Sequence, residues 1–252
     1  MGENRLHFTR AWILATSLVL VSSSCAPQVK GTLVKQCVLP SDQSGTLSGR
    51  WKAAPVPVVF AAGQFTSSEK SAITSASNIW NTYYSAALGF QFISLDGTEV
   101  STTKPNSLCS TGIVQNGQFN GQVVIYKQTA WPYSNTQAIA LTSFCPIAAS
   151  PLPTIYNAVM EVNYQYFFGS GQKRPDLASI FTHEFGHLAG LNHSCDTSGK
   201  SGFPNCNSAD MPDDYFKAVM FPVILFDTSG IGELRRYVNA NDQGRAYCLY
   251  GT

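Results

Sequence analysis

Residues 183–193 read HEFGHLAGLNH, and this string constrains the chain more than any other part of its sequence. An α-helix turns through about 100° per residue, so residues four apart lie on one face. His183 and His187 can therefore point their imidazoles at a common centre. A catalytic zinc site takes three protein ligands and keeps a fourth position open. Glu184 follows the first histidine directly and lies beside such an ion, where it can accept a proton from water.

Gly190 comes three residues after His187, and glycine adopts at little cost the left-handed conformation that ends a helix. The turn can bring His193 back as a third ligand. The preceding sequence predicts a packed helix that begins at Pro175 or Asp176. Its buried face would consist of apolar residues at helical spacing: Leu177, Ile180, Phe181, Phe185 and Leu188. The alternative is a polar helix face whose histidines meet this spacing by chance, which requires five positions to coincide.

Length and charge restrict the class of protein. The chain has 252 residues, enough for one large domain or two small ones. Charged residues make up 12% of the chain, the formal net charge is +1, and there is no basic block. We therefore expect no nucleic-acid partner. Of the four histidines, His7 lies in a predicted leader, so the remaining three all belong to the motif.

The N-terminus, residues 1–24, is typical of an export signal. Two arginines precede an apolar run over residues 11–21, which is too short to span a bilayer. The small residues before Cys25 resemble a bacterial lipoprotein processing site, so we expect Cys25 to become a lipidated N-terminus. Ordinary cleavage nearby is the alternative, because Ser22 stands where Leu or Val is usual. The protein is then either a cell-envelope lipoprotein anchored in the membrane or a secreted protein.

The cysteine count agrees with export. Seven cysteines less Cys25 leave an even set: Cys37, Cys109, Cys145, Cys195, Cys206 and Cys248. Six cysteines in an exported chain predict three disulfides, and sequence alone allows fifteen pairings. Cys195 with Cys206 is the best single guess, because this pair closes a short loop just after the third histidine.

We expect residues 25–49 to form a polar tether and residues 50–252 to form one domain. Thr66 and Glu69 make a capping box that opens a helix ending at Gly89. This helix with its two flanking strands forms a βαβ unit, whose strands must be parallel. Five strands are predicted, over residues 56–60, 90–94, 122–126, 138–142 and 155–163. A last helix is predicted to open at residue 241 or 242 and to stop at residue 251.

With the motif in place, the chain resembles the metzincin zinc proteases and, among them, the matrixins. Ser194 after the third histidine is similar to the matrixin pattern. Residues 218–222 (AVMFP) resemble the matrixin Met-turn, which places Met220 beneath the metal; Met211 is a rival candidate in a poorly matching setting. The start at residues 50–51 and the closing helix over residues 242–251 also resemble the family's catalytic domain.

This resemblance implies an α/β (α+β) fold: a twisted, mixed five-stranded sheet with two long helices, a zinc-site helix, a Met-turn and a C-terminal helix. It implies a monomeric zinc endopeptidase with one catalytic Zn²⁺ and Glu184 as general base, acting on protein or peptide substrates. The substrate would lie along a strand edge near Ile139, Ala140 and Leu141. Pro222 and Val223 would form the wall of the pocket after the cut bond.

The chain departs from the family in its histidine content, and its calcium binding and its function leave alternatives open. The chain has no spare histidines for a second, structural zinc, so that site is expected to be absent. Calcium is undecided, because Asp210, Asp213 and Asp214 suit either a ligand set or a solvated loop. The main alternative function is a zinc-binding exported lipoprotein without turnover that acts in adhesion or binding. Another is a protease restricted to one narrow substrate.

Overall fold

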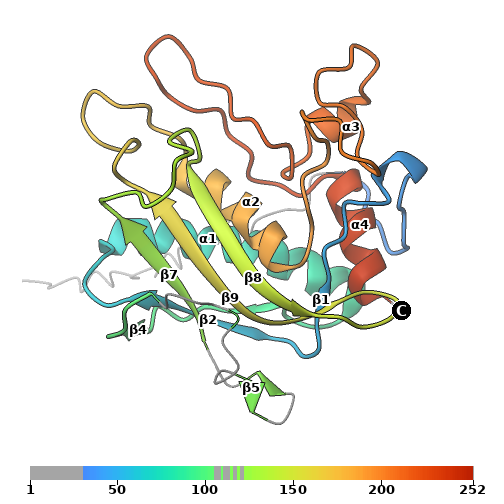
Figure 1. Cartoon of the computed structure of the whole chain (residues 1–252), viewed down its shortest axis with the longest axis horizontal. Helices are drawn as coiled ribbons and strands as arrows, with labels where there is room; N and C mark the ends of the chain where they lie inside the picture. The colour runs from blue at the N-terminus through green and yellow to red at the C-terminus, as the bar shows by residue number, and fades with distance from the viewer. Residues whose placement is uncertain (1–30, 105–108, 110–113, 116–117, 120–121, 252) are drawn as a thin grey trace, which may run out of the picture.

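The computed structural model describes residues 31–104, 109, 114–115, 118–119 and 122–251. The predicted export signal and Cys25 lie outside the described residues. Figure 1 shows one mostly parallel sheet with the long helices on one of its faces. The chain therefore has a mixed α/β fold.

The main sheet has seven strands, two more than the sequence predicts. They are β1 (Arg50–Trp51), β2 (Val56–Ala61), β3 (Ile93–Ser94), β4 (Glu99–Val100), β7 (Val123–Gln128), β8 (Ala140–Ile147) and β9 (Thr154–Asn163). The two additional strands, β1 and β4, have two residues each, which is too short to give a periodic pattern. A separate hairpin joins β5 (Val114–Gln115) to β6 (Gln118–Phe119).

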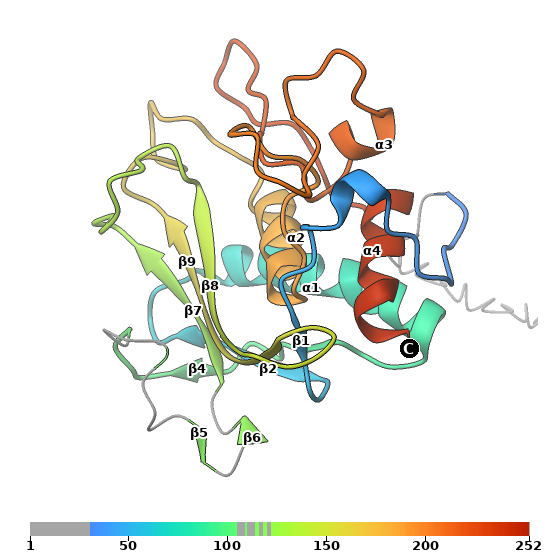
Figure 2. The same ribbon diagram turned by 45° about the vertical axis from the view of Figure 1, so that its right-hand side comes forward.

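The order across the main sheet puts one antiparallel strand at an edge. The path runs β1-β9-β7-β2-β3, with β4 also pairing with β2 and β8 pairing with β9. Strand β8 is antiparallel to β9, whereas the other pairs are parallel. Among the described strands, β8 pairs with β9 alone, so its other edge is not paired with any of them. Figures 1 and 2 show this edge on the side of the sheet where α2 lies.

Two helices cover the core face of the sheet. Helix α1 (Ser67–Leu88) begins at the predicted capping box of Thr66 and Glu69 and ends at Gly89, whose φ is 79°. Helix α2 (Leu177–Leu188) begins at Asp176, whose side chain accepts a hydrogen bond from the backbone N–H of Ser179. Both boundaries confirm the sequence prediction. The parallel pairing of β2 with β3 confirms the βαβ unit.

Buried tryptophans connect these layers. The indole N–H of Trp80 on α1 donates to the carbonyl of Thr182 on α2, at 2.7 Å. The indole N–H of Trp51 on β1 donates to the carbonyl of Leu188 at the end of the same helix, at 2.6 Å. Buried donors need such partners, and both contacts fix the axial position of α2.

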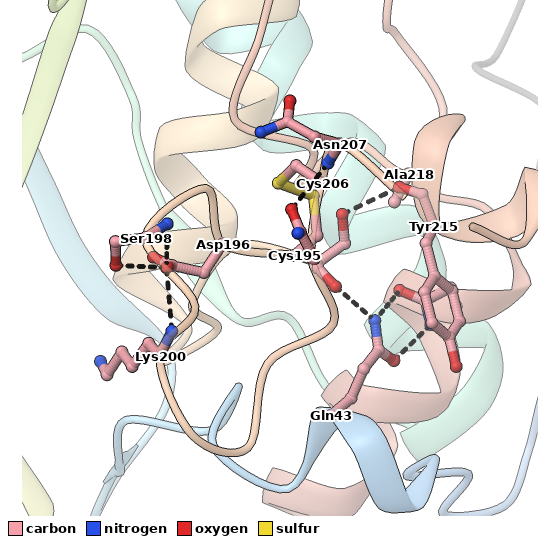
Figure 3. The surroundings of a disulfide bond; sticks show 12 residues. Gln43, Cys195, Asp196, Ser198, Lys200, Cys206, Asn207, Tyr215 and Ala218 are labelled. Carbon is pink, nitrogen blue, oxygen red and sulfur yellow. Dashed lines mark hydrogen bonds between the residues drawn. A yellow bond between two sulfur atoms is a disulfide. The ribbon is translucent and has the colours of Figure 1, made fainter. Parts of the chain in front are cut away.

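The segment over residues 31–49 packs against the rest of the chain, unlike the predicted tether. It contains a short 3₁₀ helix, η1 (Ser41–Gln43), and Gln43 is completely buried. The Gln43 amide donates to the carbonyl of Ser194 at 2.7 Å (Figure 3). Polar composition suggested a linker, but hydrogen-bonded polar side chains can be buried without a large cost.

The remaining helices close the molecule at one end. Helix α4 (Ala240–Tyr250) begins at Asn239 in a capping box with Asp242 and ends at Gly251. Its first helical residue, Ala240, comes one or two residues before the predicted start at residue 241 or 242. Helix α3 (Asp213–Phe216) is a single turn in the long segment after α2. None of the described helices is long and apolar enough to cross a bilayer.

Three disulfides join the six predicted cysteines. They link Cys195 to Cys206, Cys37 to Cys248, and Cys109 to Cys145. The first confirms the predicted pair and closes the loop shown in Figure 3. The second ties the N-terminal segment to α4. Three disulfides fit an extracellular or exported protein.

Glu69 gives the fold an acid-sensitive contact. Its carboxylate accepts hydrogen bonds from the Lys127 ammonium at 2.8 Å and the Tyr164 hydroxyl at 2.6 Å. Burial alone would raise the pKa of Glu69, but the hydrogen bonds from Lys127, Tyr164 and Thr66 outweigh it and lower the pKa to about 2. A carboxyl with a depressed pKa stabilises the fold above its unfolded-state pKa, and this stabilisation is lost as the pH falls towards 2.

Glu69→Gln should therefore lower the free energy of unfolding at pH 7 by about 1–2 kcal/mol. Between pH 4.5 and pH 2.5 the difference between the two proteins should shrink, because the wild type loses this contribution there. Urea unfolding of both proteins at pH 7, pH 4.5 and pH 2.5 measures this difference. A difference that stays constant across them would contradict the account.

Candidate metal centre

Helix α2 presents the first two histidines on one face, and the turn after it returns the third. The ligand nitrogens of His183, His187 and His193 all lie within 4.8 Å of one another. Among the described His, Cys, Asp and Glu residues, these three form the one group arranged to hold a metal ion. The clustered aspartates form no comparable group there, and Asp213 instead pairs with Lys217.

Gly190 makes the return of the chain possible. Its φ is 97°, in the left-handed region that favours glycine. A Cβ at this position would lie 1.9 Å from the carbonyl oxygen of Gly49. The segment just before β1 therefore passes directly over the turn, and a side chain on Gly190 would displace this segment.

Backbone carbonyls fix the orientation of two imidazoles. Nδ1 of His183 lies 2.7 Å from the carbonyl oxygen of Val219, and Nδ1 of His187 lies 2.8 Å from that of Leu191. A carbonyl only accepts, so each Nδ1 carries the proton and each Nε2 presents a lone pair. Nε2 of His187 lies 3.2 Å from Nε2 of His193.

The protonation of the three rings suits a cation. Burial lowers the pKa of His187 to about 3 and that of His193 to about 4, and it lowers the pKa of His183 well below its ordinary value. The rings are therefore neutral at pH 7, which is the form that binds metal. Three neutral imidazoles with convergent nitrogens, two of them with Nδ1 beside a backbone carbonyl, form a donor set that could hold a metal ion.

Glu184 lies beside the histidines and is 5% exposed. The Thr142 hydroxyl on β8 donates to its Oε2 at 2.7 Å. Burial raises the pKa of Glu184 to about 7, although the Thr142 hydrogen bond opposes the shift. A carboxyl with a pKa in this range can take up and release a proton near neutral pH.

Met220 lies beneath α2 and is completely buried. A Cβ on Gly186 would meet its sulfur at 2.2 Å and Trp80 at 3.0 Å, so the glycine allows the methionine to lie directly against the helix. The backbone carbonyl of Met220 accepts a hydrogen bond from the N–H of Ser194 at 2.8 Å. The turn at Met220 thus contacts both α2 and the segment carrying the third histidine.

A buried ion pair on α4 supports this turn. The Asp242 carboxylate accepts hydrogen bonds from the backbone N–H groups of Val219 at 2.7 Å and Met220 at 3.2 Å. Arg245 lies 3.4 Å from Asp242 and donates to the carbonyl of Asn192 at 3.0 Å. Both charged side chains are completely buried. Burial raises the pKa of Asp242, and Arg245 with the backbone donors opposes that shift.

The histidines and Glu184 line a cavity of about 850 Å³. Other residues of its lining were predicted from the sequence as substrate contacts: Ile139, Ala140, Leu141, Pro222 and Val223. The start of β8 and the segment after Met220 therefore both line the cavity.

Three residues around the centre were missed by sequence reasoning. Thr142 is a strand residue, and nothing in the motif indicates which strand faces Glu184. Asp242 and Arg245 are far from the motif in sequence, and charged residues on a helix are usually exposed. The capping-box spacing of Asn239 and Asp242 was the one local signal, and it indicates a helix start only.

Comparison with known proteins gives no further identification: no protein-family model matches the chain, and no curated protein matches it at a significant level.

Gly190→Ala should destabilise the chain by several kcal/mol, because it adds both a backbone penalty and a collision with Gly49. Gly63→Ala is the matched control: φ is 70° and nothing lies within 4 Å of the added Cβ. That control should cost about 1–2 kcal/mol. Thermal unfolding of the two variants compares them, and equal losses would contradict the proposed close approach.

Asp242→Asn should lower the free energy of unfolding by about 3–5 kcal/mol, because it leaves the buried Arg245 charge uncompensated. It should also weaken metal retention, since the turn at Val219 orients His183. The control is Asp213→Asn, whose side chain is 81% exposed in its pair with Lys217. That substitution should cost less than about 1 kcal/mol. A small effect of Asp242→Asn in urea unfolding would show that the buried pair does not support the turn.

Proposed function

We propose that the chain is a zinc-dependent endopeptidase of the metzincin class, similar to the matrixins. The observation that carries the proposal is the convergence of three neutral imidazoles and a buried glutamate on one open cavity. The buried methionine under α2 supports it, because the resemblance places a Met-turn there. The parallel-dominated sheet, the capped helices and the left-handed Gly190 are compatible with this class.

His183, His187 and His193 would hold the zinc ion. A zinc ion in such a site acidifies water and polarises a carbonyl group. The residues around the histidines orient the rings and keep them neutral. Carbonyls of Val219 and Leu191 hold two rings with their Nε2 atoms towards the centre, and burial keeps all three rings neutral.

Glu184 is the proposed general base. It is aimed into the same cavity and would accept a proton from the attacking water, then return it to the amine that leaves. Thr142 hydrogen-bonds one carboxylate oxygen and so limits the rotation of the group. The other oxygen, Oε1, is the one proposed to receive the proton.

The substrate would add itself as an extended strand along the outer edge of β8. Edge strands offer unpaired backbone groups, and peptides bind such edges by main-chain hydrogen bonds. Ile139, Ala140 and Leu141 lie where this pairing would occur, and Pro222 with Val223 would form the facing wall. Glu184 lines the same cavity and would lie next to the peptide bond to be cut.

We further propose that the protein acts outside the cytoplasm, as a lipoprotein anchored through Cys25 or as a secreted enzyme. The three disulfides support export. Mass spectrometry of the N-terminal peptide from the native host tests the anchor. Acyl chains on Cys25 are expected, and an unmodified N-terminus near that residue would favour secretion.

The activity is tested by digesting a peptide library with zinc-loaded protein, with and without a chelator. Wild-type protein should cut peptides, and the chelator should abolish cutting. Glu184→Gln should lower the rate about 10²- to 10⁴-fold while zinc content stays unchanged. Glu99→Gln, on an outer strand paired with Lys70, should leave the rate unchanged.

Two results would argue against the proposal. Full activity of Glu184→Gln would remove the glutamate from the mechanism. A correctly folded, zinc-loaded wild type that cuts no peptide would favour the alternative, a zinc-binding exported protein without turnover.

A further inference from the structure

The cavity lining includes one lysine. Besides the three histidines, two ionisable side chains line the cavity, those of Glu184 and Lys173. Glu184 belongs to the proposed mechanism. Lys173 lies in the loop before α2 and has no role in what has been described so far.

Backbone contacts hold Lys173 in a defined place. Its carbonyl accepts a hydrogen bond from the N–H of Phe168 at 3.0 Å. The next residue, Arg174, donates through its N–H to the carbonyl of Gly230 at 2.8 Å and accepts from the N–H of Gly232 at 3.1 Å. The lysine is thus fixed between two loops, so its side chain starts from a defined position.

The Lys173 side chain points along an aromatic wall of the cavity. Its Nζ lies 4.9 Å from the centroid of the Phe226 ring, and Phe226 and Phe167 both line the cavity. A cation over an aromatic face is held in place but keeps its charge available. The ammonium therefore faces the space that a bound peptide would fill.

Nearby carboxylates are already engaged with other groups. Asp176 pairs with Arg236, and Glu233 pairs with Arg235. Asp227 accepts hydrogen bonds from Ser229 and from the backbone N–H of Ile231. Within the part of the chain that the structure describes, no carboxylate forms an ion pair with Lys173. Lys173 is an exposed residue of the cavity lining, and an ammonium group there without an ion-pair partner favours an anionic ligand group.

We propose that Lys173 is a specificity-determining residue that selects peptides carrying a carboxylate at the position facing Phe226. This inference rests on the proposed function and names its substrate class: an extended peptide with Asp or Glu at that position. A free C-terminal carboxylate offers the same chemistry, and the test separates it from a side chain.

The test compares peptides that differ at one position, with Glu, Gln or Lys there, each with a free and with an amidated C-terminus. Wild-type protein should cut the Glu peptide about 2- to 5-fold faster than the Gln peptide, measured as kcat/KM, whichever C-terminus it has, because an ion pair with an exposed lysine is partly screened by solvent. Lys173→Met should remove this ratio, and Lys173→Glu should reverse it in favour of the Lys peptide. If the Glu and Gln peptides are instead cut equally, and both are cut faster with a free than with an amidated C-terminus, the terminal carboxylate is the group selected and the assignment of an Asp or Glu side chain is overturned.

Lys200→Glu is the matched control, because Lys200 also lies over an aromatic ring, at 4.6 Å from Phe203, but does not line the cavity. It should leave the ratio unchanged. The inference is overturned if wild type shows no preference for Glu over Gln, or if Lys173→Met keeps the preference.

If no peptide is cut at all, the proposed function fails. A binding measurement then tests separately whether Lys173 selects a carboxylate. Calorimetric titration of the same peptides into the zinc-loaded protein should then show tighter binding of the Glu peptide in wild type and equal binding in Lys173→Met. Equal binding of the Glu and Gln peptides by wild type would overturn the inference on its own.

Discussion

Two backbone carbonyls determine the geometry on which the site depends. Val219 and Leu191 accept from Nδ1 of His183 and His187, at 2.7 and 2.8 Å, and so direct the opposite nitrogens towards each other. In a buried site an imidazole without such a partner would carry an unsatisfied N–H or adopt the other tautomer. The positions of these two carbonyls, and not the histidines alone, therefore decide whether three nitrogens converge.

Those carbonyls are held by segments from both ends of the described chain. Asp242 on α4 binds the turn that includes Val219, and Arg245 binds the carbonyl of Asn192. From the N-terminal side, the carbonyl of Thr46 accepts from the N–H of Asn192 at 2.8 Å. The disulfide between Cys37 and Cys248 joins the two ends. The site is thus supported by contacts that lie far apart in sequence.

Local sequence signals predicted the helices whose ends are marked by capping residues. The capping box at Thr66 and the left-handed Gly89 delimit α1, and Asp176 with Gly190 delimits the region of α2, because these residues satisfy or end a helix by themselves. The convergence of the three histidines followed from helical spacing and one glycine. The contact between β8 and the substrate was placed by family resemblance. Ile139, Ala140 and Leu141 do line the cavity, and their role in substrate binding stays a prediction.

Features that depend on contacts between residues far apart in sequence could not be predicted. Strands β1 and β4 exist because longer strands provide an edge, and two residues give no periodic pattern of their own. Gln43 looked like part of a linker, although its amide finds a buried carbonyl at Ser194. Two of the three disulfides join cysteines whose proximity depends on the whole fold. Arg245 is buried only because α4 packs beside the turn after α2.

The central claim is that three imidazole nitrogens surround one zinc ion and leave one position open. X-ray absorption at the zinc edge of the purified, zinc-loaded protein tests this directly. The account predicts one zinc per chain, three imidazole nitrogens at roughly 2.0–2.1 Å and one further light atom. Sulfur in the coordination shell, fewer than three imidazoles, or a protein that retains no zinc would contradict it.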